Sequence, residues 1–149
     1  MKIALYSQKY KAEYAPLLTS IFEELIAYQD NIVIEADLLR RYSEHNPFSY
    51  TVDTFHNVED LPSNTDLMLT IGGDGTILWA MTLIQHLQIP ILGINTGRLG
   101  FLATISQSEI GEMFSKIHNG QYHTDERSVL QINDSEGNPI APLNFALNE

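Results

Sequence analysis

The sequence predicts a doubly wound α/β domain with a mostly parallel sheet, followed by the first strands of an all-β domain. Apolar runs of strand length alternate with segments whose apolar residues recur every three to four positions, a pattern typical of parallel strands joined by helices. Glycine clusters at 72–75 and 97–100 come directly after two of these runs. After Gly120 the helical patterns stop, and strand-like runs surround a polar turn.

The elements of the first domain, expected to cover residues 1–125, follow from this periodicity. The predicted strands are Lys2–Ser7, Asn31–Ile34, Thr51–Phe55, Asp66–Ile71 and Ile89–Ile94. The predicted helices are Glu13–Tyr28, Ala36–Glu44, Thr76–Leu87 and Ser106–Asn119. The apolar face expected on the first helix consists of Leu17, Leu18, Ile21, Phe22, Leu25 and Ile26. Ser106 and Glu109 predict a capping box at the start of the last helix.

The second domain is expected to occupy residues 126–149 and to continue further. Strands are predicted at 128–133 and 140–147, around a turn at 134–139. Because an isolated hairpin is marginally stable in water, we expect these strands to open an all-β domain that is cut off at 149. The alternative is that the hairpin packs on the first domain or pairs with another subunit.

Composition excludes several classes of function. The chain has 8 Lys and Arg against 19 Asp and Glu, a net charge of −11, and no basic stripe that would bind nucleic acid. No apolar run has the length of a membrane span, and the N-terminus lacks the features of a signal peptide. Cysteine is absent, which excludes disulfides and thiolate metal sites and agrees with a cytoplasmic location. The histidines show no metal-ligand spacing and are expected to be structural or on the surface.

The most informative segment is Gly-Gly-Asp-Gly at 72–75, between a buried strand and a helix. Glycines allow the backbone to approach a ligand closely, and a helix start offers free N–H groups and a partial positive charge. Gly72, Gly73 and Gly75 would let phosphate oxygens reach these groups, and Asp74 would accept a proton. The alternative is an ordinary corner in which Asp74 caps the helix.

Three segments of the sequence together resemble those of a known family. Gly-Gly-Asp-Gly-Thr after a strand resembles a kinase superfamily that includes phosphofructokinases, lipid kinases and NAD kinases. The segment 93–102, Gly-Ile-Asn-Thr-Gly-Arg-Leu-Gly-Phe-Leu, closely resembles the NAD kinase pattern, and Ala-Leu-Asn-Glu at 146–149 resembles its Asn-Glu segment. The distinguishing elements of the lipid kinases and phosphofructokinases are absent. The chain is therefore similar to the N-terminal half of an NAD kinase.

The resemblance implies a Rossmann-like N-terminal domain, a C-terminal β-sandwich and a dimer or tetramer. It implies transfer of the γ-phosphoryl of ATP, or of polyphosphate, to the 2′-hydroxyl of the adenosine ribose of NAD, with a divalent metal such as Mg²⁺. By motif match, Asp74 is the proton acceptor and Gly75 lies against the dinucleotide. Asn148 and Glu149 match the pair that contacts NAD. The positions that match pocket-lining residues are Leu78, Phe101 and Leu102.

The chemistry of these residues agrees with the resemblance. Phosphoryl transfer depends mainly on positioning and charge neutralisation. An aspartate at a helix start should have a low pKa, so Asp74 is expected to orient the hydroxyl more than to act as a strong base. One departure is Trp79, which stands where many family members have a basic residue. Arg98, between two glycines, is then the only cation near either cluster in the sequence, and two interpretations stay open: a phosphate contact or a simply exposed side chain.

Two other functions stay open on the sequence. One is a Gly-Gly-Asp-Gly kinase that acts on a lipid or a sugar. The other is a nucleotide-binding module without catalysis, because the resemblance places much of the NAD site in a second domain. We therefore expect these 149 residues alone to be weak or inactive as an enzyme.

Overall fold

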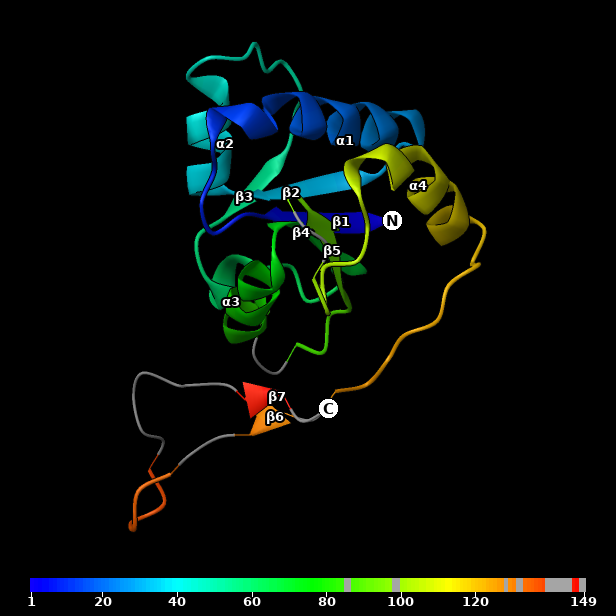
Figure 1. The fold of residues 1–149 in the computed structure, drawn as a ribbon. Coiled ribbons are helices and arrows are strands. Elements are labelled where there is room, and N and C mark those ends of the chain that lie inside the picture. Colours follow the sequence, from blue (N-terminus) through cyan, green and yellow to red (C-terminus); the bar gives the residue numbers. More distant parts are fainter. Residues whose placement is uncertain (85–86, 98–99, 128, 131–132, 139–145, 148–149) are drawn as a thin grey trace.

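The computed structural model describes residues 1–84, 87–97, 100–127, 129–130, 133–138 and 146–147. A five-stranded sheet lies at the centre of the molecule (Figure 1), with strand order β3-β2-β1-β4-β5 and every pairing parallel. Its strands are β1 (Lys2–Tyr6), β2 (Asn31–Glu35), β3 (Asp53–Phe55), β4 (Leu67–Gly72) and β5 (Ile91–Asn95). The predicted doubly wound α/β fold is confirmed.

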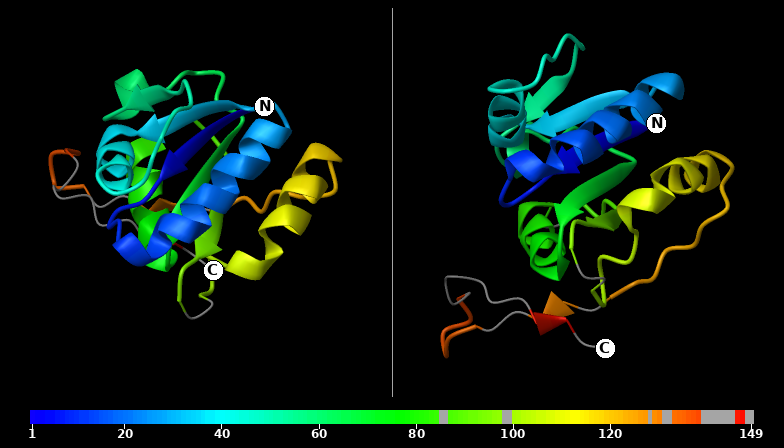
Figure 2. Two further views of the ribbon diagram at one scale, coloured as in Figure 1. Left: turned by 90° about the horizontal axis from the view of Figure 1, so that it is seen from above. Right: turned by 45° about the horizontal axis from the view of Figure 1, so that its top comes forward.

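Helices cover both faces of this sheet (Figures 1 and 2). They are α1 (Ala15–Ala27), α2 (Ala36–Ser43), α3 (Asp74–Ile84) and α4 (Ile110–His118). Figure 1 shows α1, α2 and α4 on one face and α3 on the other. Alternation along β1 explains the two layers of the core, because Ile3 and Leu5 pack with α1, α2 and α4 while Ala4 packs with α3. None of the helices in the described part of the chain has the length and apolar character needed to cross a membrane.

The helix starts follow local chemistry. A 3-10 turn (Ala12–Tyr14) precedes α1, which carries a proline in its first turn, where a missing N–H costs nothing. The Glu35 carboxylate caps α2 by accepting the N–H of Leu38 at 2.7 Å. The predicted capping box is confirmed, since the Glu109 carboxylate accepts the N–H of Ser106 at 2.8 Å. It opens a 3-10 turn (Gln107–Glu109) that leads into α4.

Two details of the predicted elements are wrong. Ile26 is 39 % exposed, although periodicity assigned it to the buried face of α1. It lies nine residues after Leu17, and at about 100° per residue this places it opposite Leu17, at the edge of the buried face. The last strand begins at Ile91 and not at Ile89, because Pro90 has no N–H to donate to the sheet. A further 3-10 turn (Val58–Asp60) lies between β3 and β4.

The C-terminal strands form a sheet of their own. β6 (Val129–Leu130) pairs antiparallel with β7 (Ala146–Leu147), apart from the five-stranded sheet. The described part of the predicted turn, 134–138, is present, and there the Asp134 carboxylate accepts the N–H groups of Glu136 and Asn138, both at 2.9 Å. The remainder of the two predicted strands lies outside the described residues.

Candidate functional site at the carboxyl end of the sheet

The two glycine clusters meet at the carboxyl end of the sheet, where β4 and β5 finish side by side. Gly72 pairs with Asn95 as the last residue of each strand. Gly72 has φ +154°, and the side chain of Thr76 fills the place where a Cβ would stand. The turn therefore requires glycine at 72, both for its backbone and for the packing of the residue that follows the motif.

Asp74 is the first residue of α3, and its carboxylate points to the second glycine cluster. Oδ2 accepts the N–H of Phe101 at 2.9 Å. Oδ1 accepts the N–H groups of Leu102 at 3.0 Å and Ala103 at 2.9 Å. Among the described residues these partners come from the loop after β5 and not from α3, so helix capping does not account for this side chain. The acid holds two segments of the chain together.

These contacts determine the charge state of the acid. Burial acts to raise the pKa of Asp74, and the N–H groups of Ala103, Phe101 and Leu102 outweigh it, so that the pKa lies below its ordinary value. The sequence predicted a low pKa from the helix start. The direction of the shift agrees, but its cause is the set of hydrogen bonds from the 101–103 backbone and not the helix start. Asp74 is therefore an ionised acceptor at neutral pH.

The surroundings of this acid include three predicted pocket residues. Phe101 is 87 % exposed, which is unusual for a phenylalanine, while Leu78 and Leu102 are half-buried. Gly73 and Gly75 are exposed, and beyond the adjoining backbone no heavy atom lies within 4 Å of where a Cβ would stand on either. The site thus presents bare backbone and an apolar ring beside a carboxylate. Trp79, 54 % exposed on α3, adds a second aromatic surface residue.

The remaining predicted site residues cannot be placed. Asn148 and Glu149 lie outside the described residues, as does Arg98. The structure places the 72–75 turn, Phe101 and Leu102 together and Leu78 one turn further along α3, while the binding roles of all the predicted site residues stay predictions.

Asn95 is a residue of this site that the sequence analysis missed. It is buried at the end of β5, where its amide donates to the carbonyl of Ala103 at 3.2 Å and its side-chain oxygen accepts the N–H of Gly97 at 2.7 Å. These bonds shape the loop whose N–H groups hold Asp74. An asparagine between a buried strand and a glycine was the available signal, because such side chains commonly bond to the nearby backbone.

A hollow of about 320 Å³ lies next to this loop. Its lining residues are Asn95, Thr96, Gly97, Ser106, Gln107 and Ser108. Asp74 does not line this hollow, so the hollow lies beside the loop and is separate from the space around the carboxylate.

The His, Asp and Glu side chains of the described residues also bear on metal binding. Within the described ranges, no group of three or more His, Cys, Asp or Glu side chains lies close enough to hold an ion. Mg²⁺ commonly keeps several waters and binds through one or two carboxylates together with substrate phosphates. The Asp74 carboxylate together with the phosphates of a substrate fits that mode, and the described residues form no all-protein cage.

Comparison with known proteins identifies the family of this chain. Residues 9–122 match the family described as the ATP-NAD kinase N-terminal domain. The chain is 36 % identical over 150 residues to an NAD kinase of Flavobacterium psychrophilum and 38 % identical over 151 residues to one of Christiangramia forsetii. Each match covers 100 % of this chain and 51 % of the relative, so the chain spans about half the length of these curated relatives.

A solved structure shares the fold. Yeast NADH kinase complexed with NADH superposes with a TM-score of 0.76 at 20 % identity, over 98 % of this chain and 46 % of that one. The predicted family is thus confirmed by the family match and by the relatives. This chain belongs to the ATP-NAD kinase family and carries its N-terminal domain.

Proposed function

We propose that this chain forms the N-terminal part of an enzyme that transfers the γ-phosphoryl of ATP to the 2′-hydroxyl of the adenosine ribose of NAD, giving NADP. Family membership supports the reaction. The observation that carries the proposal is the Asp74 carboxylate, held at the carboxyl end of the sheet beside exposed glycine backbone.

Asp74 Oδ2 is the atom we assign to the ribose hydroxyl. A carboxylate offers about four acceptor positions. Oδ1 accepts two hydrogen bonds from the described residues and Oδ2 accepts one, so Oδ2 keeps an acceptor position for a substrate O–H. Because its pKa is low, the acid would mainly orient the hydroxyl and take its proton late, as the phosphoryl group transfers.

We assign the rest of the dinucleotide site to residues around this acid. Gly75 would lie against NAD, and the pocket wall would come from Leu78, Phe101 and Leu102. An exposed phenylalanine suits this role, since an aromatic ring can stack on a nucleotide base. Asn148 and Glu149 would read ribose hydroxyls or the adenine edge, because an amide both donates and accepts while a carboxylate accepts only.

The phosphates would be held by backbone N–H groups of the 72–75 turn and by a divalent cation. A bound Mg²⁺ would neutralise charge on the phosphate oxygens of ATP. Gly72 and Gly73 give those oxygens access to the backbone, and substrate phosphates would provide most of the ligands of the ion.

We also propose the domain organisation, the location and the oligomeric state of the full-length protein. Residues 1–125 form the α/β domain and residues 126–149 begin an all-β domain, which the separate β6–β7 sheet supports. The full-length protein is a cytoplasmic homo-oligomer, a dimer or tetramer. These 149 residues alone bind substrates weakly or turn them over slowly, because part of the site would come from the second domain.

The test is a comparison of the full-length protein with its Asp74→Asn variant. The wild-type protein should form NADP from NAD and ATP with Mg²⁺, and the variant should lose turnover while it still binds NAD. Wild-type rates in the variant would remove Asp74 from the mechanism, and a wild-type protein that phosphorylates a lipid or sugar in place of NAD would overturn the reaction. Purified residues 1–149 should give little NADP, and robust formation would contradict the expected dependence on a second domain.

A further inference from the structure

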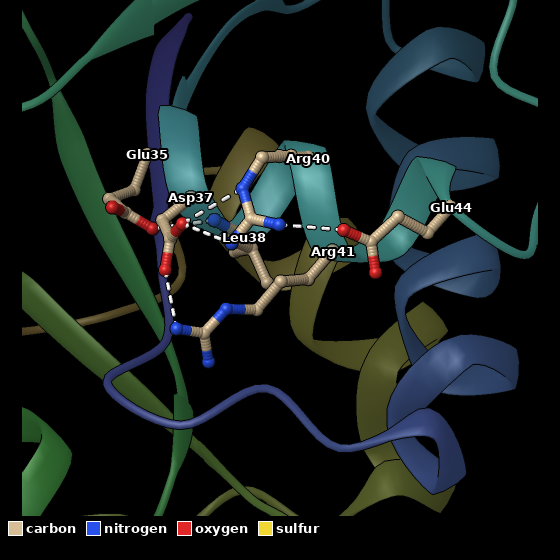
Figure 3. A network of polar contacts seen from close by, with 6 residues as sticks. All are labelled: Glu35, Asp37, Leu38, Arg40, Arg41 and Glu44. Atoms are coloured by element: carbon tan, nitrogen blue, oxygen red, sulfur yellow. Dashed lines mark hydrogen bonds and ion pairs between the residues drawn. The ribbon is translucent and has the colours of Figure 1, made fainter.

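The cations of this chain are few, and most of those described are already paired. Figure 3 shows Arg40 and Arg41 directed at Asp37, with Arg40 also reaching Glu44. The other described pairings are Lys2 with the Asn64 side chain, Lys11 with Glu13 and Lys116 with Glu112. Over the described residues, Lys9 and Arg127 are the cationic side chains with neither an ion pair nor a side-chain hydrogen bond of this kind.

The order of the strands gives Lys9 a particular place. From β1 the chain passes to β2 on one side, and from β4 it passes to β5 on the other, so the winding reverses between β1 and β4. In open α/β sheets ligands bind beyond the carboxyl ends of the strands at such a reversal. The segment after β1 contains Lys9, and the segment after β4 is the Gly72–Gly75 turn.

A buried hydrogen bond fastens these two segments together. Tyr6 pairs with Thr70 in the sheet, and the hydroxyl of the next residue, Ser7, donates to the carbonyl of Ile71 at 2.8 Å. Neighbouring strands lie about 4.8 Å apart. Lys9 follows Ser7 by two residues and is exposed, so a long flexible side chain starts at the same edge as Gly73 and Asp74.

We propose that Lys9 and the Gly72–Gly75 turn form one polyphosphate subsite, in which the Lys9 ammonium neutralises phosphate oxygens of the phosphate donor. The identity of the donor as ATP rests on the proposed function. A polyphosphate that approaches a chain with a net charge of −11 meets an unfavourable field, and a carboxylate, Asp74, lies at the subsite itself. An unpaired ammonium at this edge offsets that repulsion, while the turn contributes only neutral N–H groups.

The experiment compares Lys9→Met, Lys9→Arg and Lys11→Met in the full-length protein. Methionine removes the charge and keeps a long apolar stem. Lys11 is the matched control, since it lies two residues away and is engaged with Glu13 at 3.2 Å. Calorimetry with ATP and, separately, with inorganic tripolyphosphate measures binding without turnover, and NAD titrations report the other substrate.

Lys9→Met should weaken both polyphosphates about tenfold, the worth of one hydrogen bond to a charged group. Lys9→Arg should retain their affinity within about threefold, and NAD affinity should stay unchanged. Raised salt should weaken the wild-type interaction more than that of Lys9→Met. Equal affinities in wild type and Lys9→Met, or an equal loss for NAD and ATP, would overturn the subsite. A wild-type protein that binds tripolyphosphate through Lys9 but makes no NADP would refute the proposed function and leave the subsite standing.

Discussion

The carboxylate of Asp74 occupies the space in which a side chain at Gly100 would stand. A Cβ built on Gly100 would overlap Oδ1, Oδ2 and Cγ of Asp74. The two residues belong to different strand–loop units, one after β4 and one after β5. Position 100 therefore requires glycine because of the space that the Asp74 carboxylate occupies, and not because of the backbone conformation at 100.

Gly100→Ala should therefore destabilise the 149-residue chain. Either the acid or the loop must move, and overpacking of this kind costs about 1–3 kcal/mol. Chemical denaturation measures the free energy of unfolding. Gly97→Ala is the control from the same segment, because the nearest atom to its Cβ, the side-chain oxygen of Asn95, is 4.0 Å away. A loss that is equal in the two variants would contradict the proposed overlap.

Asp74→Asn should lower stability at neutral pH by about 1–3 kcal/mol, because an NH₂ group would face backbone N–H groups. The folded pKa of Asp74 lies below the unfolded value of about 3.9, so the stabilisation is present above that value and is lost as pH falls through the folded pKa. The difference in unfolding free energy between wild type and variant should thus narrow below about pH 4. A difference that widens on acidification would refute this sign.

Phe101→Ala should separate binding from stability. The ring is 87 % exposed, and alanine keeps the N–H that Asp74 accepts, so the free energy of unfolding should change by less than about 0.5 kcal/mol. In the full-length enzyme the KM for NAD should rise about tenfold if the ring stacks on the dinucleotide. Tyr122→Ala, at 56 % exposure, provides the aromatic control. An unchanged KM would remove Phe101 from the proposed pocket.

His118→Ala should destabilise the fold far from the site. The Asp30 side chain is fully buried, with one oxygen 2.9 Å from His118 Nε2 and the other 2.7 Å from the N-terminal nitrogen, and the His118 ring stacks on Tyr28 at 4.0 Å. Loss of the imidazole should cost about 1–3 kcal/mol in urea denaturation.

The matched control for that substitution is His123→Ala. His123 also has an aspartate neighbour, Asp125 at 3.7 Å, but its side chain is 90 % exposed, so removal should change stability by less than about 0.5 kcal/mol. Similar losses at both positions would show that the buried carboxylate of Asp30 does not depend on its histidine.

Local patterns were sufficient to predict most of the fold. Period and turn residues placed the helices and the parallel strands, and the capping box at Ser106 was readable from two residues. Errors arose where local signals compete, as at Pro90. Its apolar neighbours suggest a strand, but Pro90 has no N–H to donate to the sheet, and β5 begins at Ile91. Ile26 shows the same limit, since an apolar residue at the edge of a helical face need not be buried.

The residues of the candidate site could be proposed from the sequence, but their contacts could not. Asp74 and its flanking glycines stand out in the sequence, yet the partners of the carboxylate lie 27 to 29 residues away. Those contacts depend on the pairing of β4 with β5, which no local pattern specifies. The place of Lys9 depends in the same way on the order of the strands, so it emerged only with the fold.

The overlap at Gly100 couples the evolution of positions 74 and 100. Glycine is needed at 100 only while position 74 carries a side chain that reaches into the loop. A lineage that lost the acid could accept alanine or serine at position 100. After such a substitution, restoring the acid alone would no longer restore the site. A later substitution at position 100 can thus make the loss of the carboxylate hard to reverse.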